Sequence, residues 1–331
     1  MAKSPRSKSG ENRPSGSPTP VPPRRGANGS HPTARAARPR SGGQARQIRR
    51  RNQRLIAIAA SALVVIVIAV LVAVKLSSGT ASANAEVNTP VTQAQISQLT
   101  SVPVATLVAA AKAAQPSALN PPTNLPSSTT PLTSAGKPEI LYMGAEYCPY
   151  CAAERWPLVM ALSKFGTFSN LHATKSSSTD VNANTPTFTF LGSTYSSPYL
   201  SFTAVEMEDR AGKPLQNPTA QQNSILSTYD APPYTSSAGT IPFVDMGGKF
   251  VINGTEYDAS ALAGKSFDSA VGYIASANNT TSRAAEGVAG HLIGTICALT
   301  NNQPAKVCSA VPASLKTGTA SSVNQGSSAA G

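Results

Sequence analysis

The chain contains few of the residues from which most catalytic and metal sites are built. Among its 331 residues, 13% are charged and 5% are aromatic, and there are only three histidines, four cysteines and one tryptophan. No Ser-His-Asp set, nucleotide-binding loop or paired carboxylates stand out, so nothing points to the common hydrolase and nucleotide chemistries. His31, His172 and His291 stand far apart and are expected to pack or to face solvent. We therefore predict that the protein has no metal site and uses no cofactor.

Acidic residues are nearly missing from the first 54 positions. Residues 1–54 contain fourteen Lys and Arg and one acid, Glu11, for a charge of +13, whereas the rest of the chain has a charge of −1. This segment also lacks aromatic residues on which bases could stack, so we expect no nucleic-acid partner. Its Pro, Gly, Ser and Arg content predicts a disordered basic cytoplasmic tail that contacts anionic lipid.

A run without charged residues follows the tail. Residues 55–74 are twenty uncharged residues, long enough to cross about 30 Å of hydrocarbon. Arginines at four of the positions 49–54 precede the run, and only Lys75 follows it closely. The positive-inside rule then predicts a transmembrane helix at 55–76, with the N-terminus in the cytoplasm and the C-terminal part extracytoplasmic. The localisation expected is the cell membrane, crossed once, with the lipid bilayer as a partner.

A secretory signal peptide is the competing interpretation of this run. Residues 83–85 (Ala-Asn-Ala) have the small-x-small form of a cleavage site. The apolar run is longer than the usual signal core of about 7 to 15 residues, which favours an uncleaved anchor. Both interpretations export the rest of the chain.

Two cysteines three positions apart carry the clearest chemical signal. Cys148-Pro149-Tyr150-Cys151 follows an apolar stretch, 139–145, that is typical of a strand, and precedes a stretch, 152–156, that is typical of a helix. A cysteine at a helix N-terminus lies beside unpaired backbone N–H groups and the positive end of the helix dipole, which stabilise the reactive thiolate. The motif therefore predicts a pair that alternates between dithiol and disulfide.

Around this motif the sequence predicts one α/β domain at 137–308. It is preceded by a Ser/Thr/Pro-rich linker with short helices, 77–136, and followed by a disordered tail, 309–331. Within the domain we expect a helix after the CxxC, then a parallel strand, a hairpin, a helix capped by Asn217, a diglycine hairpin, a helix that starts at Ser266 and a last helix capped by Ser282. In order, the strands are expected at 170–174, 187–191, 199–206, 241–246 and 249–252.

The other two cysteines, Cys297 and Cys308, are the second natural pair. The segment 287–299 is predicted to be helical, and 301–304 (Asn-Asn-Gln-Pro) is typical of a turn, so Cys308 can fold back on Cys297. In an exported protein this pair is expected to form a structural disulfide. A sharper alternative is a second exchange-active pair that passes electrons to the first.

The order of elements resembles the thioredoxin superfamily. Two motifs carry the resemblance: Cys148-Pro149-Tyr150-Cys151, whose central dipeptide is similar to that of glutaredoxins, and Ile241-Pro242, which matches the cis-proline of the superfamily. The resemblance implies that Ile241 and Pro242 lie against the CxxC and that their backbone binds the substrate chain. Tyr147 stands where a thioredoxin has Trp, and the long interval between Cys151 and Pro242 implies an inserted hairpin and helix at 192–238.

Residues 96–308 more closely resemble a prokaryotic family of membrane-anchored, thioredoxin-like proteins, domain of unknown function 929 (DUF929). Four stretches carry this second resemblance: 144–156 (GAEYCPYCAAERW), 161–168 (ALSKFGTF), 185–190 (TPTFTF) and 241–245 (IPFVD). The fold class expected is therefore a thioredoxin-like mixed sheet with flanking helices, plus the N-terminal transmembrane helix.

The predicted function is that of a membrane-tethered thiol–disulfide oxidoreductase acting on the thiols or disulfides of exported proteins, together with a membrane redox partner. Cys148 would be the exposed nucleophile, and Cys151, one helical turn further and more buried, would resolve the mixed disulfide. Arg155 would favour a thiolate, whereas Glu146 and Glu154 would oppose it.

Two alternatives stay open at this point. The CxxC could be a static disulfide in a redox-inert binding or envelope-assembly domain, since one fold hosts several functions. Zinc binding is the other rival, but Cys297 and Cys308 are too widely spaced for the second close pair of a four-cysteine site.

Overall fold

The computed structural model describes residues 87–114, 119, 121–235 and 238–319. The predicted cytoplasmic tail, the transmembrane helix at 55–76 and the first ten residues of the predicted linker lie outside this part of the chain. Within the described part no single helix is long and apolar enough to cross a bilayer; the bent pair Gln93–Thr100 (α2) and Val104–Ala113 (α3) passes only by length and composition.

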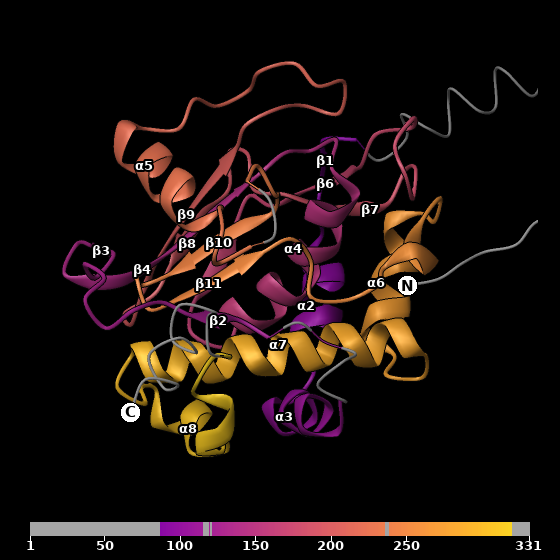
Figure 1. Cartoon of the computed structure of the whole chain (residues 1–331). Coiled ribbons are helices and arrows are strands. Elements are labelled where there is room, and N and C mark those ends of the chain that lie inside the picture. The colour runs from indigo at the N-terminus through magenta and orange to yellow at the C-terminus, as the bar shows by residue number, and fades with distance from the viewer. Residues whose placement is uncertain (1–86, 115–118, 120, 236–237, 320–331) are drawn as a thin grey trace, which may run out of the picture. The chain divides into compact units, whose positions relative to one another are not determined.

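A six-stranded mixed sheet forms the centre of the fold (Figure 1). The strand before the CxxC, β4 (Lys137–Gly144), pairs in parallel with β9 (Ser201–Glu206) and antiparallel with β10 (Phe243–Met246). The remaining strands are β11 (Phe250–Asn253), β2 (Thr123–Asn124) and β3 (Thr133–Ser134). Alternate residues of β4 face opposite sides: Ile140 and Tyr142 join the larger core, and Leu141 and Met143 join a smaller one. The fold is therefore of the mixed α/β class.

The parallel neighbour of β4 is not the one that the sequence predicted. The segment expected at 170–174 forms β6 (His172–Lys175), which pairs antiparallel with β7 (Pro186–Thr189) and β1 (Thr89–Pro90) in a separate sheet. A strand beside β4 is covered on both faces and needs apolar side chains on both. Phe202, Ala204 and Val205 of β9 meet this need, whereas β6 consists of His-Ala-Thr-Lys, of which only Ala173 is apolar.

The hairpin predicted between 187–191 and 199–206 is also wrong, since β7 and β9 lie in different sheets. Between them, β8 (Thr194–Ser196) pairs with β5 (Thr167–Ser169) in a third, two-stranded sheet. The diglycine hairpin is as predicted: β10 and β11 pair across Gly247 and Gly248, which both have positive φ.

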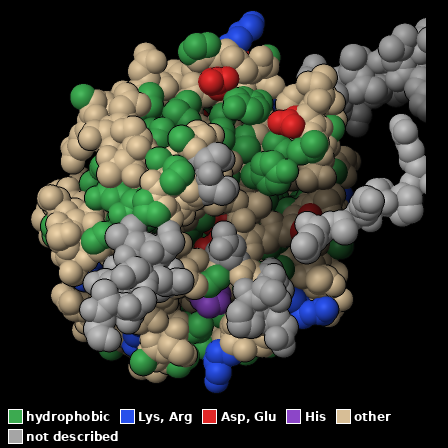
Figure 2. All heavy atoms as spheres, in the orientation of Figure 1, with side chains coloured by type: hydrophobic (Ala, Val, Ile, Leu, Met, Phe, Trp, Pro, Cys, Tyr) green, Lys and Arg blue, Asp and Glu red, His purple; other side chains and the backbone are tan. Residues whose placement is uncertain are grey.

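Helices cover the sheet on both sides. The long α7 (Thr280–Leu299) runs between α3 on one side and α4 (Pro149–Leu162), the helix that follows the CxxC, on the other (Figure 1). A Cβ atom at Gly290 would collide with the Leu107 carbonyl oxygen, so this glycine permits the close approach of α3 to α7. On the other face, α5 (Ala220–Tyr229) packs over the smaller core. Figure 2 shows one face of the molecule, on which charged side chains are few and scattered.

The folded part extends beyond the predicted domain boundaries at both ends. Leu99 of α2 and Leu107 of α3 are fully buried, so both helices, predicted within a linker, belong to the core. At the other end, Val311 and Leu315 are buried, and the Asn124 N–H donates to the Thr319 carbonyl. Residues 309–319 are therefore part of the fold and not of a disordered tail. The sequence did not predict this, because their few apolar residues are spaced among Ser and Ala.

Two helices begin at residues other than those predicted. Thr219 caps α5, and its hydroxyl accepts from the Gln222 N–H, whereas Asn217 lies outside the helix. Asn279 caps α7 and leaves Ser282 in the first turn. The helix α6 (Phe267–Ala275) begins where the sequence predicted, and Ser266 is its N-cap. The short helix α8 (Ala305–Cys308) and the 3-10 turns Ser260–Leu262 and Ala313–Leu315 complete the described helices.

Candidate active site

Cys148 lies at the junction between the central strand β4 and the helix α4. It is the N-cap residue of α4, and its Sγ accepts a hydrogen bond from the Cys151 N–H at 3.2 Å. Pro149 occupies the first position of the helix, where a missing N–H costs nothing. The sequence thus places the Cys148 sulfur where helix N-terminal donors stabilise negative charge.

Neither Cys148 nor Cys151 forms a disulfide, and both thiols are buried. Cys151 is 0% exposed and Cys148 only 3%, so the prediction of an exposed nucleophile was wrong. Cys148 is covered because Tyr147 and Ile241 pack against the small cluster that Ala145 forms with the two cysteines. Tyr150, which is 46% exposed, is the residue of the motif that faces solvent.

The two thiols differ in acidity, and the causes are local. The Cys151 thiol, the Cys151 N–H and the Arg155 guanidinium lower the pKa of Cys148 against the opposing effect of burial. Burial raises the pKa of Cys151 well above its usual value, and the neighbouring Cys148 adds to the rise. Cys148 is therefore the thiolate former of the pair, which is the assignment expected of a nucleophile and its resolving partner.

Ile241, which precedes Pro242, lies against the CxxC. The Cys148 thiol donates to the Ile241 carbonyl at 3.7 Å, and the Ile241–Pro242 peptide bond is cis. Pro242 directly precedes β10, which is the antiparallel neighbour of β4. The structure thus brings Ile241 against the two cysteines, although it lies 93 positions after Cys148.

A buried ion pair between Arg155 and Glu206 lies close to the thiols. Arg155 donates from Nε and Nη2 to both carboxylate oxygens of Glu206, at 3.0 and 2.6 Å, and from Nη2 to the Ala145 carbonyl at 3.0 Å. Both side chains are fully buried, and Arg155 also lies over the Tyr142 ring. Because one guanidinium holds α4, the end of β9 and the residue after β4, the pair fixes the loop that carries Cys148.

The comparison with protein families decides the affiliation of the chain. The family described as "Domain of unknown function (DUF929)" matches residues 124–289, half of the chain. The chain belongs to the DUF929 family. Neither the curated proteins nor the solved structures gave a match.

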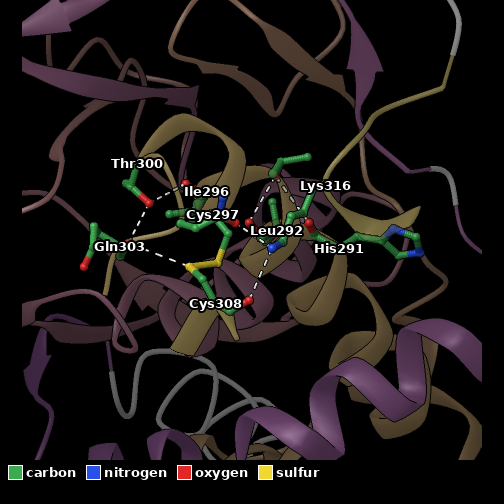
Figure 3. The surroundings of a disulfide bond; sticks show 10 residues. His291, Leu292, Ile296, Cys297, Thr300, Gln303, Cys308 and Lys316 are labelled. Carbon is green, nitrogen blue, oxygen red and sulfur yellow. Dashed lines mark hydrogen bonds between the residues drawn. A yellow bond between two sulfur atoms is a disulfide. The ribbon is translucent and has the colours of Figure 1, made fainter. Parts of the chain in front are cut away.

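The DUF929 match includes the CxxC, Arg155, Glu206 and Pro242 but ends before the second cysteine pair. Cys297, on α7, and Cys308, on α8, form a disulfide in which both residues are buried (Figure 3). His291 points away from this disulfide, and Lys316 donates to the Cys308 carbonyl. The CxxC cysteines take no part in this disulfide, and within the described residues no group of three His, Cys, Asp or Glu side chains could hold a metal.

Sequence reasoning missed two buried acids near the site. Glu206 is the last residue of β9. A single acid at the end of an otherwise apolar strand is the sequence pattern that could have indicated a buried carboxylate. Glu256 follows β11 and lies close enough to Glu154 of α4 for the two buried carboxyl groups to interact. Burial raises the pKa of Glu154 to about 8 and that of Glu256 well above its usual value. Near neutral pH Glu154 is therefore mainly protonated, and it opposes the thiolate less than its type suggests.

Proposed function

We propose that this DUF929 protein is a membrane-tethered, extracytoplasmic thiol–disulfide oxidoreductase that acts on exported proteins through Cys148 and Cys151. The observation that carries the proposal is the asymmetric thiol pair at the N-terminus of α4, unbonded and with pKa values shifted in opposite directions. Such an arrangement suits exchange, because one sulfur attacks as thiolate and the other stays protonated until it is needed.

A thioredoxin-like fold is part of the same proposal. It is supported by β9 in parallel beside β4, by the antiparallel β10–β11 hairpin and by the helix α7 that packs on α4. Ile241 and Pro242 then form the loop against which a substrate chain would lie. The short β5–β8 ribbon and α5 supply the insertion between the CxxC and this loop.

In the reducing direction, the Cys148 thiolate attacks one sulfur of a substrate disulfide. A bond forms between that sulfur and Cys148 Sγ, the substrate S–S bond breaks, and the departing sulfur takes up a proton. Cys151, as its thiolate, then attacks Cys148 Sγ, which releases the second substrate thiol and leaves a Cys148–Cys151 disulfide. Two electrons pass to the substrate, and a dithiol partner in the membrane must return them; the oxidising direction is the reverse.

The location is proposed from the sequence outside the described residues. The arginines before the apolar run 55–74 direct the N-terminus to the cytoplasm, so the thiols face an oxidising compartment. Substrates are then exported proteins, and the bilayer itself is a partner through the helix at 55–76.

Mixed-disulfide trapping tests the proposal. In Cys151→Ser, the Cys148 thiolate attacks but is not resolved, so covalent adducts with exported proteins should accumulate and disappear on reduction. Cys148→Ser should trap none, because Cys151 is fully buried and its pKa is raised. If neither variant forms adducts and the reduced protein does not reduce insulin, the exchange proposal fails.

A redox-inert binding or envelope-assembly domain is the second candidate. One observation favours it: Cys148 is 3% exposed, less than an open nucleophile requires. It predicts that both thiols stay unmodified in the folded protein when a small alkylating reagent is added, and react only after unfolding. Alkylation of Cys148 in the native state would exclude it.

A further inference from the structure

A polar cavity of about 350 Å³ adjoins the residues that lead into Cys148. Its walls include Tyr147, Ser177, Asp180, Glu208 and Arg210. Tyr147 immediately precedes Cys148 in the chain, so the cavity adjoins the segment that carries the proposed nucleophile.

Hydrogen bonds hold the cavity walls to the loop before Cys148. The Glu146 N–H donates to the Glu208 carbonyl at 2.8 Å, and the Ser177 N–H donates to the Tyr147 carbonyl at 2.8 Å. Arg210 joins the two walls to each other, since it donates to the carbonyls of Lys175 and Ser176. The position of the cavity relative to the thiols is therefore fixed by backbone contacts.

The cavity has an acidic side next to the aromatic ring. Burial raises the pKa of Tyr147, and Glu208 and Asp180, together with the two cysteines, raise it further. The charged groups that act on the Tyr147 hydroxyl are thus anionic. The Arg210 guanidinium also lines the cavity, and together with Asp180 and Glu208 it leaves the lining with a net charge of −1. A cationic side chain would find two carboxylates and an aromatic ring together.

A few exposed apolar residues lie close to the cavity residues in the sequence. Three large apolar side chains are exposed in the described part of the chain: Tyr150, Val181 and Leu215. Tyr150 lies between the two cysteines, Val181 follows the cavity residue Asp180, and Leu215 lies three positions after the cavity residue Gly212. In the sequence, each of the three thus lies within three positions of a CxxC cysteine or of a cavity residue.

We propose that Asp180 and Glu208 are specificity-determining residues that favour substrate polypeptides with a lysine or arginine close to the reactive cysteine. The inference rests on the proposed exchange function, because the cavity is assigned to the chain that flanks the cysteine under attack. In the proposed complex the basic side chain enters the cavity beside Tyr147 while its cysteine meets Cys148.

The test uses the full-length reduced protein in detergent and three short peptides. Each peptide carries one cysteine as a mixed disulfide with thionitrobenzoate, and they differ only in a neighbouring lysine, glutamine or glutamate. Attack by Cys148 on the peptide sulfur forms the peptide–Cys148 disulfide and releases the coloured thionitrobenzoate anion, whose absorbance gives the rate.

We expect release from the lysine peptide to be about threefold to tenfold faster than from the glutamine peptide, since exposed charge pairs contribute up to about a factor of five each. The preference should shrink in 1 M salt, where the Debye length is about 3 Å. The double variant Asp180→Asn/Glu208→Gln should lose it, so that the lysine and glutamine peptides release thionitrobenzoate at equal rates. Asp258→Asn, which removes an exposed carboxylate outside the cavity, should behave as wild type.

Equal rates for the three peptides, or a preference that survives the double variant, would overturn the specificity assignment while exchange itself stands. Failure to release thionitrobenzoate from any peptide would instead remove the exchange function on which the assignment depends. The rate with the glutamine peptide also shows whether the double variant is folded.

Discussion

At the scale of single residues, the Arg155–Glu206 pair is the strongest electrostatic feature of the site. Arg155→Met leaves a buried carboxylate unpaired and removes a cation that lowers the pKa of Cys148. We expect a loss of about 3–5 kcal/mol in the free energy of unfolding and a higher pKa of Cys148. Urea unfolding and the pH dependence of Cys148 alkylation measure the two effects.

Glu206→Gln is the matched variant. It should destabilise the fold as Arg155→Met does, because it leaves the guanidinium buried without its counter-ion. The effect on Cys148 should be opposite, since the remaining positive charge is less compensated and lowers the pKa further. Shifts of the same sign in both variants would contradict the electrostatic role given to Arg155.

The Glu154–Glu256 pair predicts a pH dependence of stability. In the unfolded chain Glu154 ionises near pH 4.5, whereas in the folded protein burial raises its pKa to about 8. The folded state therefore holds the extra proton, and this contribution to stability is complete below about pH 4.5 and is lost as the pH rises towards 8. For one proton the slope is about −1.4 kcal/mol per pH unit.

Glu154→Gln should remove the contribution of one proton to this slope. Compared with the wild type, the variant should therefore be more stable at pH 8 than it is at pH 5. Glu256→Gln should flatten the slope too, because burial also raises the pKa of Glu256. Urea midpoints between pH 5 and 8 measure the slopes. Wild-type slopes in both variants would mean that neither carboxyl is protonated in the folded state.

At the scale of elements, α4 contains an internal proline, and a tyrosine replaces the helix hydrogen bond that this proline removes. Pro157 has no N–H to donate to the Ala153 carbonyl one turn earlier, and the Tyr257 hydroxyl donates to that carbonyl instead, at 2.9 Å. Tyr257→Phe leaves this buried carbonyl without a partner, so we expect a loss of about 1–3 kcal/mol.

The double-mutant cycle with Pro157→Ala isolates this contact. Alanine restores the N–H of the helix, so Tyr257→Phe should cost much less in the Pro157→Ala background. Thermal or urea unfolding of the four proteins gives the coupling. An equal cost in both backgrounds would show that Tyr257 stabilises the fold through packing alone.

Elements with a local signal were predictable from the sequence. The strand before the CxxC, the helix after it, the diglycine hairpin and the helix start at Ser266 all depend on residues within one turn or one strand. The parallel pairing of β4 with β9 was not predictable, because β6 comes first in the chain and only the apolar faces of β9 decide between them. For the same reason Glu206, 51 positions after Arg155, could not be named as its partner.

At the scale of the whole molecule, the Cys297–Cys308 disulfide joins the end of α7 to the C-terminal segment. It closes a loop across 11 positions, and constraint of the unfolded chain by such a loop contributes about 2–3 kcal/mol. Replacing both cysteines with alanine should therefore lower the melting temperature and spare exchange at Cys148. Lost exchange with unchanged stability would favour the electron-relay alternative.

The extent of the folded unit was the least predictable property at this scale. The sequence indicated one α/β domain, but the boundaries at 137 and 308 excluded α2, α3 and the buried Val311 and Leu315. These segments are rich in Ala, Ser and Thr. Their few apolar residues do not predict a folded segment by themselves, because their burial depends on packing against distant elements such as α7. In the site, the burial of Cys148 likewise depends on Ile241, which is distant in sequence.

The reduction potential of the Cys148–Cys151 pair tests the central claim most directly. The protein is equilibrated with thiol buffers of graded potential, free thiols are alkylated, and the oxidised fraction of this pair is read by mass spectrometry. Exchange predicts one two-electron transition between about −120 and −270 mV, the range of exchange catalysts. A transition below about −300 mV, typical of structural disulfides, or no Cys148–Cys151 disulfide under any condition, would contradict the account.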